Sequence, residues 1–217
     1  MFLSGLTLAV VSAIAVGWAP RDVAERPRIV ALGDSLTSGR GIGSANAFPA
    51  ILQQHVDEAG LEYTVVNAGV SGDTTTRALR RLDSALAEQP QILILELGVN
   101  DGLRGVPVPQ VRANLEKIIE AAKAQDIQVL LCAMEALPLQ GWQYTIDFHR
   151  MYDDLAAKYD VPLVPFLMNG VLGNRDLMSD DGVHPNTAGA RAIADTIFEY
   201  VQPMARRLVA ATTPGTP

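Results

Sequence analysis

The chain has 217 residues, enough for one domain with a substantial hydrophobic core. Hydrophobic residues make up 48% of it and charged residues 19%, a balance typical of a folded globular protein and not of a disordered one. The formal net charge of −7 argues against nucleic acid as a partner, because binding nucleic acid requires a basic surface.

An uncharged, largely apolar stretch occupies residues 2–19. It is close to the minimum length of a membrane span and also fits a signal peptide with a long apolar region. The Ala-Ile-Ala at 13–15 is typical of a cleavage site, whereas the arginines that follow the stretch favour a retained segment with its C-terminal side in the cytoplasm. We expect residues 1–25 to be a signal peptide or an N-terminal membrane anchor, so that the protein is periplasmic or secreted, or else membrane-anchored through residues 2–19.

From residue 27 onward, apolar runs alternate with amphipathic segments. The apolar runs predict short buried strands at 28–32, 63–67, 92–97, 128–133 and 161–164. Helical spacing of apolar residues predicts helices at 47–59, 75–88, 109–125, 146–158 and 186–201, with Pro203 bending or ending the last one. A domain at 26–210 and a flexible tail at 211–217 follow from this pattern.

The alternation of helices with strands that are apolar on both faces predicts an α/β fold. Its architecture is a three-layer α/β/α sandwich around a central, mostly five-stranded parallel sheet. Ligands of such open sheets bind beyond the carboxyl ends of the strands. Ser35, Gly72 and Asn100 follow the first three strands, and Asp181 and His184 precede the last helix, so four loops are expected to meet at one edge.

Ser35, His184 and Asp181 together supply the groups needed for nucleophilic ester hydrolysis. Ser35, in the Gly-flanked turn 33–39, is the candidate nucleophile, although a Gly-Asp-Ser sequence is also typical of an ordinary turn. His184 is the candidate base, and Asp181 can accept a hydrogen bond from its far ring nitrogen; Asp180 is the competing choice. The alternative for this segment is a plain helix-entry loop.

A tetrahedral intermediate also needs hydrogen-bond donors for its negative oxygen. The backbone N–H groups of Ser35 and Gly72 and the side-chain amide of Asn100 are the candidates for this oxyanion hole. A plain turn glycine and a helix cap are the alternatives for Gly72 and Asn100. Asp34 is expected to brace the nucleophile turn and not to react, because a carboxylate there repels an oxyanion.

Cys132 lies in an apolar run and is expected to be a small buried hydrophobe. No metal or cofactor is expected, because the three histidines are far apart and no Cys/His cluster has ligand spacing. Apolar residues on the motif edge are expected to line an acyl cleft. They are Leu103, Val106, Pro107, Leu137, Pro138, Leu139, Trp142 and Val183.

With these residues in place, the chain resembles the GDSL or SGNH hydrolases over nearly its whole length after residue 27. Gly33-Asp34-Ser35-Leu36 is similar to the family's first block, and the Ser, Gly, Asn and His of the family name match Ser35, Gly72, Asn100 and His184. The segments 96–105, 161–166 and 180–186 resemble the periplasmic branch that holds arylesterases and a multifunctional thioesterase/lysophospholipase. Many relatives carry glycine where this chain has Val99, and the larger valine side chain should narrow the site beside Asn100.

This resemblance implies a flavodoxin-like α/β/α fold and metal-free hydrolysis of esters or thioesters. The leading hypothesis is a serine esterase, arylesterase-like, that cleaves short to medium acyl esters through an acyl-enzyme on Ser35. An acyl-CoA thioesterase or lysophospholipase, and an acyltransferase using the same acyl-enzyme, are the alternatives. A small-molecule ester or thioester is the expected partner.

Overall fold

The computed structural model describes residues 26–212 and shows the expected α/β fold. Five parallel strands form one sheet in the order β2-β1-β3-β4-β5, which is the flavodoxin-like order. The strands are β1 (Arg28–Gly33), β2 (Thr64–Gly69), β3 (Pro90–Glu96), β4 (Gln128–Cys132) and β5 (Leu163–Val164).

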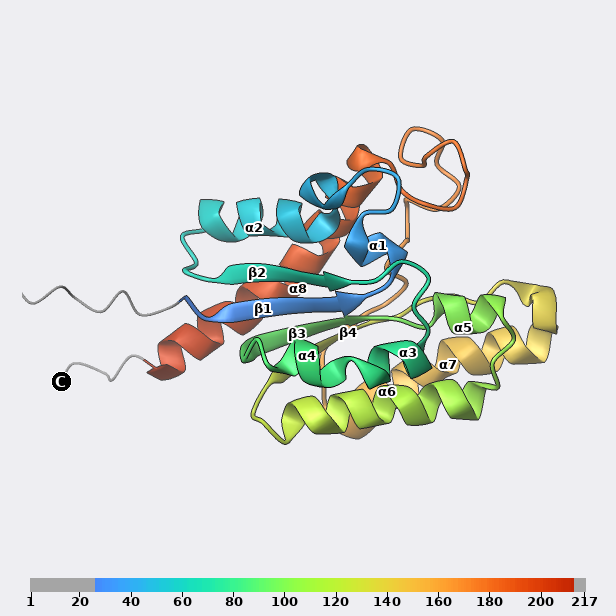
Figure 1. Ribbon diagram of the computed structural model, residues 1–217, viewed down its shortest axis with the longest axis horizontal. Helices are drawn as coiled ribbons and strands as arrows, with labels where there is room; N and C mark the ends of the chain where they lie inside the picture. The colour runs from blue at the N-terminus through green and yellow to red at the C-terminus, as the bar shows by residue number, and fades with distance from the viewer. Residues whose placement is uncertain (1–25, 213–217) are drawn as a thin grey trace, which may run out of the picture.

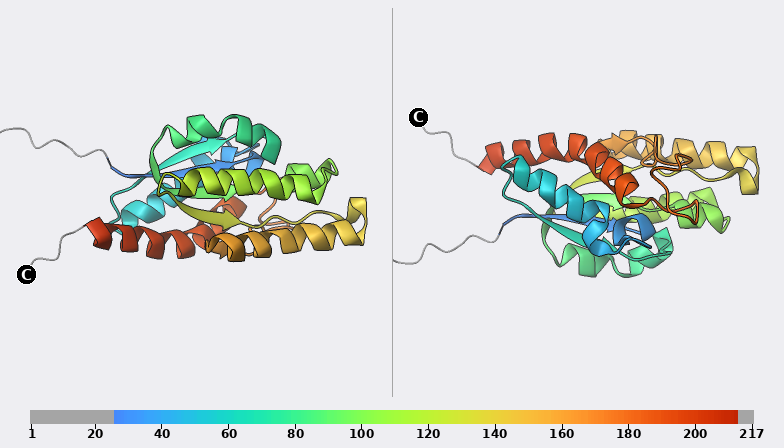
Figure 2. Two further views of the ribbon diagram at one scale, coloured as in Figure 1. Left: turned by 90° about the horizontal axis from the view of Figure 1, so that it is seen from below. Right: turned by 90° about the horizontal axis from the view of Figure 1, so that it is seen from above.

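Helices cover both faces of this sheet (Figures 1 and 2). On one face α2 packs against α8, and on the other α6 packs against both α3 and α7. The helices are α1 (Ser35–Ser38), α2 (Phe48–Glu58), α3 (Thr75–Arg80), α4 (Leu82–Leu86), α5 (Val99–Leu103), α6 (Val108–Lys123), α7 (Trp142–Tyr159) and α8 (Thr187–Thr212). The described residues also form two short 3-10 helices, η1 (Ser44–Asn46) and η2 (Pro138–Gln140).

The central strands explain why several loops meet at one edge. Residues 29–32 of β1 and 92–95 of β3 are fully buried, because helices cover both faces of the sheet there. At the carboxyl end, Gly33 is aligned with Gly69 of β2 and with Glu96 of β3, and Glu96 is aligned with Cys132 of β4. Four strands therefore end at the same level, on the right of Figure 1, and their loops emerge side by side.

Three helices differ from the sequence prediction. The helix expected at 75–88 is two helices, because Arg81 leaves helical geometry with φ −112° and ψ 10°. A short helix, α5, follows β3 where a loop was expected. The last helix continues through Pro203 to Thr212 and does not end there. Val201, Met204 and Ala205 are buried on both sides of this proline, and their packing offsets the hydrogen bond that it removes.

Among residues 26–212, no helix combines the length and apolar character required to cross a membrane. The signal peptide or anchor predicted at 1–25 lies outside the described residues and stays a prediction, as does most of the predicted tail.

Candidate active site

A tight turn places Ser35 directly after the central strand. Asp34 caps α1, since its Oδ1 accepts a hydrogen bond from the backbone N–H of Leu36 at 3.1 Å. The turn requires glycine at position 33, because a Cβ there would lie 1.9 Å from Thr37 Oγ1 and 2.5 Å from Glu96 Oε2. Ser35 thus sits at the first position of a one-turn helix, with its hydroxyl at the edge of the sheet.

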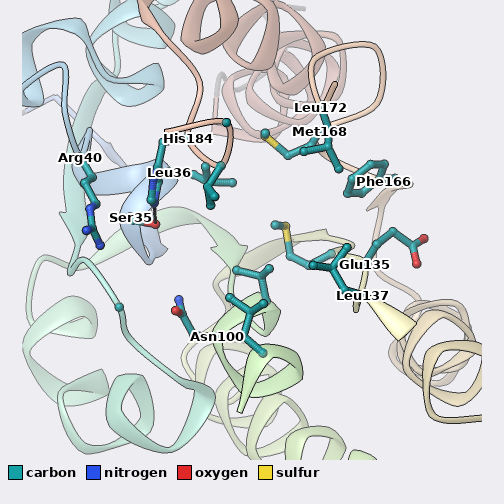
Figure 3. Close-up of a pocket in the computed structure, with 16 residues that line it drawn as sticks. Ser35, Leu36, Arg40, Asn100, Glu135, Leu137, Phe166, Met168, Leu172 and His184 are labelled. Atoms are coloured by element: carbon teal, nitrogen blue, oxygen red, sulfur yellow. Dashed lines mark hydrogen bonds between the residues drawn. The ribbon is translucent and has the colours of Figure 1, made fainter. Parts of the chain in front are cut away.

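The loop before α8 brings Asp181 and His184 to this hydroxyl, and Figure 3 shows His184 beside Ser35. Asp181 Oδ1 accepts from the backbone N–H groups of Val183 and His184, both at 2.9 Å. Asp181 Oδ2 lies 2.6 Å from Nδ1 of the His184 ring, and Nε2 of that ring lies 3.0 Å from Ser35 Oγ. Asp180 makes none of these contacts. The structure therefore joins Ser35, His184 and Asp181 in one chain of hydrogen bonds.

Asp181 is ionised, as a residue that orients the His184 ring should be. Hydrogen bonds from the backbone N–H of His184, from its ring and from the backbone N–H of Val183 hold the pKa of Asp181 well below its usual range. Asp181 is consequently a carboxylate at all ordinary pH values. A carboxylate against Nδ1 selects the ring tautomer whose Nε2 faces Ser35 as an acceptor.

Two further loops carry the expected donor groups. Gly72, after β2, has φ +78°, a left-handed conformation that favours glycine, and no atom lies within 4 Å of where a Cβ would be. Asn100, in α5, donates from Nδ2 to Asp34 Oδ2 at 2.8 Å, which leaves the other N–H of its amide available. Both residues line the same pocket as Ser35 and His184.

Arg104 connects these two loops. Its guanidinium donates to the backbone carbonyl of Asn100 at 3.1 Å and to that of Gly72 at 3.3 Å. A second connection joins α5 to α3, because Asp101 accepts hydrogen bonds from the backbone N–H and the hydroxyl of Thr75 at 2.8 and 2.7 Å. The candidate donors on Gly72 and Asn100 are therefore held relative to one another by side chains of α5.

Two buried carboxyl groups lie beneath the nucleophile turn. Glu96 Oε2 accepts from the backbone N–H of Asp34 at 3.1 Å and from Thr37 Oγ1 at 2.7 Å, while Oε1 has no hydrogen-bond partner within residues 26–212. Burial raises the pKa of Asp34 to about 6. Burial, and then the neighbouring Asp34 carboxylate, raise the pKa of Glu96 well above its usual value. Both carboxyls thus favour their protonated forms more than exposed ones do.

A pocket of about 460 Å³ opens beside Ser35, within the size range of small-molecule sites. Of the residues expected to line it, Leu103, Leu137 and Val183 do so, whereas Val106, Pro107, Pro138, Leu139 and Trp142 lie elsewhere. Val106 packs against the core and Pro107 caps α6, while Trp142, the first residue of α7, is 73% exposed. Val99, which was expected to narrow the site beside Asn100, also lines the pocket. The wall is completed by residues that sequence reasoning missed: Leu36, Arg40, Met134, Glu135, Phe166, Met168 and Leu172.

Some of the pocket-lining residues that were missed could have been predicted from the sequence. Met134 and Glu135 follow β4, and Phe166 and Met168 follow β5, so the rule that located Ser35 and Asn100 also points to them. Glu96 carried a different signal, as the single carboxyl group in an apolar strand. Arg40, two residues beyond the one-turn helix of the nucleophile, had no such signal.

Comparisons with known proteins identify the family of the chain. A model of the GDSL-like Lipase/Acylhydrolase family matches residues 31–192. Esterase TesA of Pseudomonas aeruginosa is 36% identical over 177 residues, which cover 81% of this chain and 88% of that protein. Thioesterase 1/protease 1/lysophospholipase L1 of Escherichia coli K12 is 38% identical over 177 residues, covering 81% of this chain and 84% of that protein.

A solved structure is similar over the same region. The crystal structure of the psychrotrophic esterase EstA from Pseudoalteromonas sp., inhibited by monoethylphosphonate, is 30% identical with a TM-score of 0.77. The match covers 81% of this chain and 97% of that one. With a family model over most of the chain and relatives above 30% identity, the chain belongs to the GDSL-like lipase/acylhydrolase family and is a hydrolase acting on carboxylic esters.

Proposed function

We propose that the protein is a serine esterase that cleaves acyl esters through an acyl-enzyme on Ser35. The observation that carries this proposal is the unbroken chain from Ser35 Oγ to His184 Nε2 at 3.0 Å and from His184 Nδ1 to Asp181 Oδ2 at 2.6 Å. A nucleophile, its base and an orienting carboxylate within hydrogen-bond reach form the arrangement that activates a serine.

The reaction proceeds in two halves. Ser35 Oγ attacks the carbonyl carbon while His184 Nε2 takes the hydroxyl proton, and the negative oxygen is bound by the Ser35 and Gly72 N–H groups and the Asn100 amide. Collapse of this intermediate expels the leaving group, which receives the proton from His184. Water then attacks the acyl-enzyme by the same steps, releasing the acid and restoring Ser35.

The pocket supports an acyl group as the bound part of the substrate. Most of its lining is apolar and lies to one side of Ser35, with Leu137, Phe166, Met168 and Leu172 forming the wall (Figure 3). We propose short to medium acyl esters, including aryl esters, as the preferred class. The name of the Escherichia coli relative makes acyl-CoA thioesters and lysophospholipids the second candidates. A panel of p-nitrophenyl esters of increasing acyl length, palmitoyl-CoA and a lysophospholipid ranks these classes.

Ser35→Ala and His184→Ala test the mechanism. Each is expected to lower kcat by several orders of magnitude, because the nucleophile or its base is lost while the fold is kept. Hydrolysis of p-nitrophenyl butyrate and the circular-dichroism spectrum measure the two effects. His55→Ala is the matched control, since His55 lies on α2 beside Asp195 of α8 and does not line the pocket. Near-normal turnover by Ser35→Ala would falsify the proposal.

Asn100→Ala tests the oxyanion role separately. Loss of one donor to the negative oxygen is expected to lower kcat about 100-fold, with a much smaller change in KM, because the donor acts on the transition state. Steady-state kinetics on the same ester provide both numbers. An unchanged kcat removes Asn100 from the proposed oxyanion site and leaves the Ser35 and Gly72 N–H groups as its donors.

We also propose that residues 1–25 direct export, so that the enzyme acts in the periplasm or outside the cell, or at the membrane if this segment is retained. The apolar stretch at 2–19 and the Ala-Ile-Ala at 13–15, which is typical of a cleavage site, support this proposal.

A further inference from the structure

The pocket is asymmetric about the nucleophile. In Figure 3, Ser35 lies between the Arg40 side chain on one side and the apolar wall on the other. An ester bound at Ser35 has two arms, so its acyl chain and its leaving group must extend in different directions. With the acyl chain against Leu137 and Phe166, the leaving group extends toward Arg40.

Arg40 is unpaired within residues 26–212. Its guanidinium makes no hydrogen bond or ion pair there, whereas Arg81 binds Asp73 and Arg104 binds two backbone carbonyls. The backbone of Arg40 is nevertheless fixed, because its N–H donates to the carbonyl of Ser35 at 3.1 Å. The exposed side chain of Arg40 thus presents its charged donors to the pocket that contains the nucleophile, with nothing in the described chain to bind.

The charge at the other end of the pocket has the opposite sign. Besides His184, the charged residues of the lining are Arg40 and Glu135. The Glu135 carboxylate lies 2.6 Å from His149 Nδ1, at the far side of the apolar wall in Figure 3. An anionic group on the substrate is therefore attracted to the Arg40 end and repelled from the Glu135 end.

We propose that Arg40 is a specificity-determining residue that binds a phosphate on the leaving group, close to the ester, as in the glycerophosphate headgroup of a lysophospholipid. This inference rests on the proposed function. A guanidinium pairs with phosphate through parallel charge-assisted hydrogen bonds, which a neutral alcohol cannot supply. Because Arg40 lies in the same pocket as Ser35, the phosphate must be separated from the ester by a short spacer such as glycerol. The phosphates of coenzyme A lie beyond the much longer pantetheine arm.

Two substrates that differ only in the phosphate test this inference. 1-Lauroylglycerol 3-phosphate and 1-lauroylglycerol share the acyl chain and the ester, and lauroyl-CoA carries its phosphates at a distance. The full-length wild type is compared with Arg40→Gln, which removes the charge at similar size, and Arg40→Lys, which keeps it. Arg206→Gln is the control, since Arg206 is exposed toward the C-terminal end of α8 and does not line the pocket. All are measured as kcat/KM at low ionic strength.

Arg40→Gln is expected to lower the ratio of kcat/KM for the phosphate ester to that for the neutral ester by about tenfold. Arg40→Lys should retain part of this ratio and Arg206→Gln all of it, and added salt should reduce it in the wild type. A ratio that is the same in Arg40→Gln and wild type overturns the inference, as does a larger loss on lauroyl-CoA than on the phosphate ester. If the wild type cleaves p-nitrophenyl butyrate but not the phosphate ester, the inference fails and the proposed function stands. If Ser35→Ala cleaves p-nitrophenyl butyrate as well as the wild type does, the proposed function itself fails.

Discussion

At the scale of single residues, the nucleophile depends on groups that do not touch the substrate. Asp34 caps the helix of Ser35 and accepts from the Asn100 amide, so one carboxyl group orients both the nucleophile turn and a candidate oxyanion donor. Glu96 in turn accepts from the backbone of Asp34 and from the hydroxyl of Thr37. The expectation that Asp34 braces the turn came from its position beside Ser35, and the support from Glu96 was not anticipated.

The raised pKa of Glu96 makes the stability of the protein depend on pH. The folded state holds its proton more tightly than the unfolded state does, so the stabilisation present at low pH is lost as pH rises above the usual glutamate value of 4.5. Glu96→Gln keeps the acceptor oxygen and cannot ionise. The free energy of unfolding of the variant relative to wild type is therefore expected to increase with pH from about 5 to about 8.

Urea denaturation of both proteins at a series of pH values measures this difference. The related variant Glu135→Gln is the control, because Glu135 is only partly buried and its carboxylate pairs with His149. A difference between Glu96→Gln and wild type that is constant over this pH interval contradicts the expected role of the buried carboxyl group.

At the scale of elements, the two candidate oxyanion loops are positioned by a helix that the sequence did not predict. The segment 99–103 follows Gly98 and contains Gly102, and its apolar residues show no periodicity long enough to indicate a helix. It was therefore expected to be a loop. As α5 it directs Asn100 toward Asp34 and Arg104 toward the Gly72 loop. These orientations depend on contacts between segments 66 and 32 residues apart along the chain.

Arg104→Gln is expected to lower kcat about tenfold with little change in KM, because Arg104 positions the donor loops without touching the substrate. Its side chain is exposed, so the free energy of unfolding should change by less than about 0.5 kcal/mol. Arg104→Lys, which retains the charge but not the fork, should recover part of kcat. Steady-state kinetics and urea denaturation of the same preparations separate the two effects.

Arg112→Gln is a suitable control, since Arg112 pairs with Asp154 on the surface between α6 and α7. Equal losses of kcat in Arg104→Gln and Arg112→Gln, or a loss of stability that accounts for the lost activity, indicate that Arg104 does not position the loops.

At the scale of the whole molecule, the site is held by a single core shared by both layers of helices. The closing helix α8 packs against α2, β4 and β5, and its residues Ile193, Ile197 and Val201 face inward at the four-residue spacing expected from the sequence. The loop that carries Asp181 and His184 leads directly into this helix, because Asn186 Oδ1 accepts from the backbone N–H groups of Ala188 and Gly189. Docking of α8 thus places the base opposite the nucleophile.

Ile197→Ala is expected to lower the free energy of unfolding by about 2–5 kcal/mol, because its fully buried side chain leaves a cavity. Ile146→Ala is the matched control; Ile146 is 42% exposed on α7, so its truncation should cost less than half as much. Urea denaturation measures both. Similar losses for the two variants imply that α8 contributes no more to the core than a surface position does.

The sequence by itself determined what depends on neighbours along the chain. Alternating apolar runs and amphipathic segments determined the α/β class, because helix and strand periods are local properties. The three-residue spacing from Asp181 to His184 and the Gly-flanked turn at Ser35 indicated the candidate site for the same reason.

Only the tertiary structure decided what depends on segments far apart in the chain. It brought His184 to within 3.0 Å of Ser35 across 149 residues, buried Glu96 beside Asp34, and built the pocket wall from the segments after β4 and β5. Within residues 26–212 it also left Trp142 in solvent and Arg40 unpaired beside the nucleophile. Distance, burial and charge pairing between such segments arise only when the sheet is assembled, because no local pattern encodes which loop faces which.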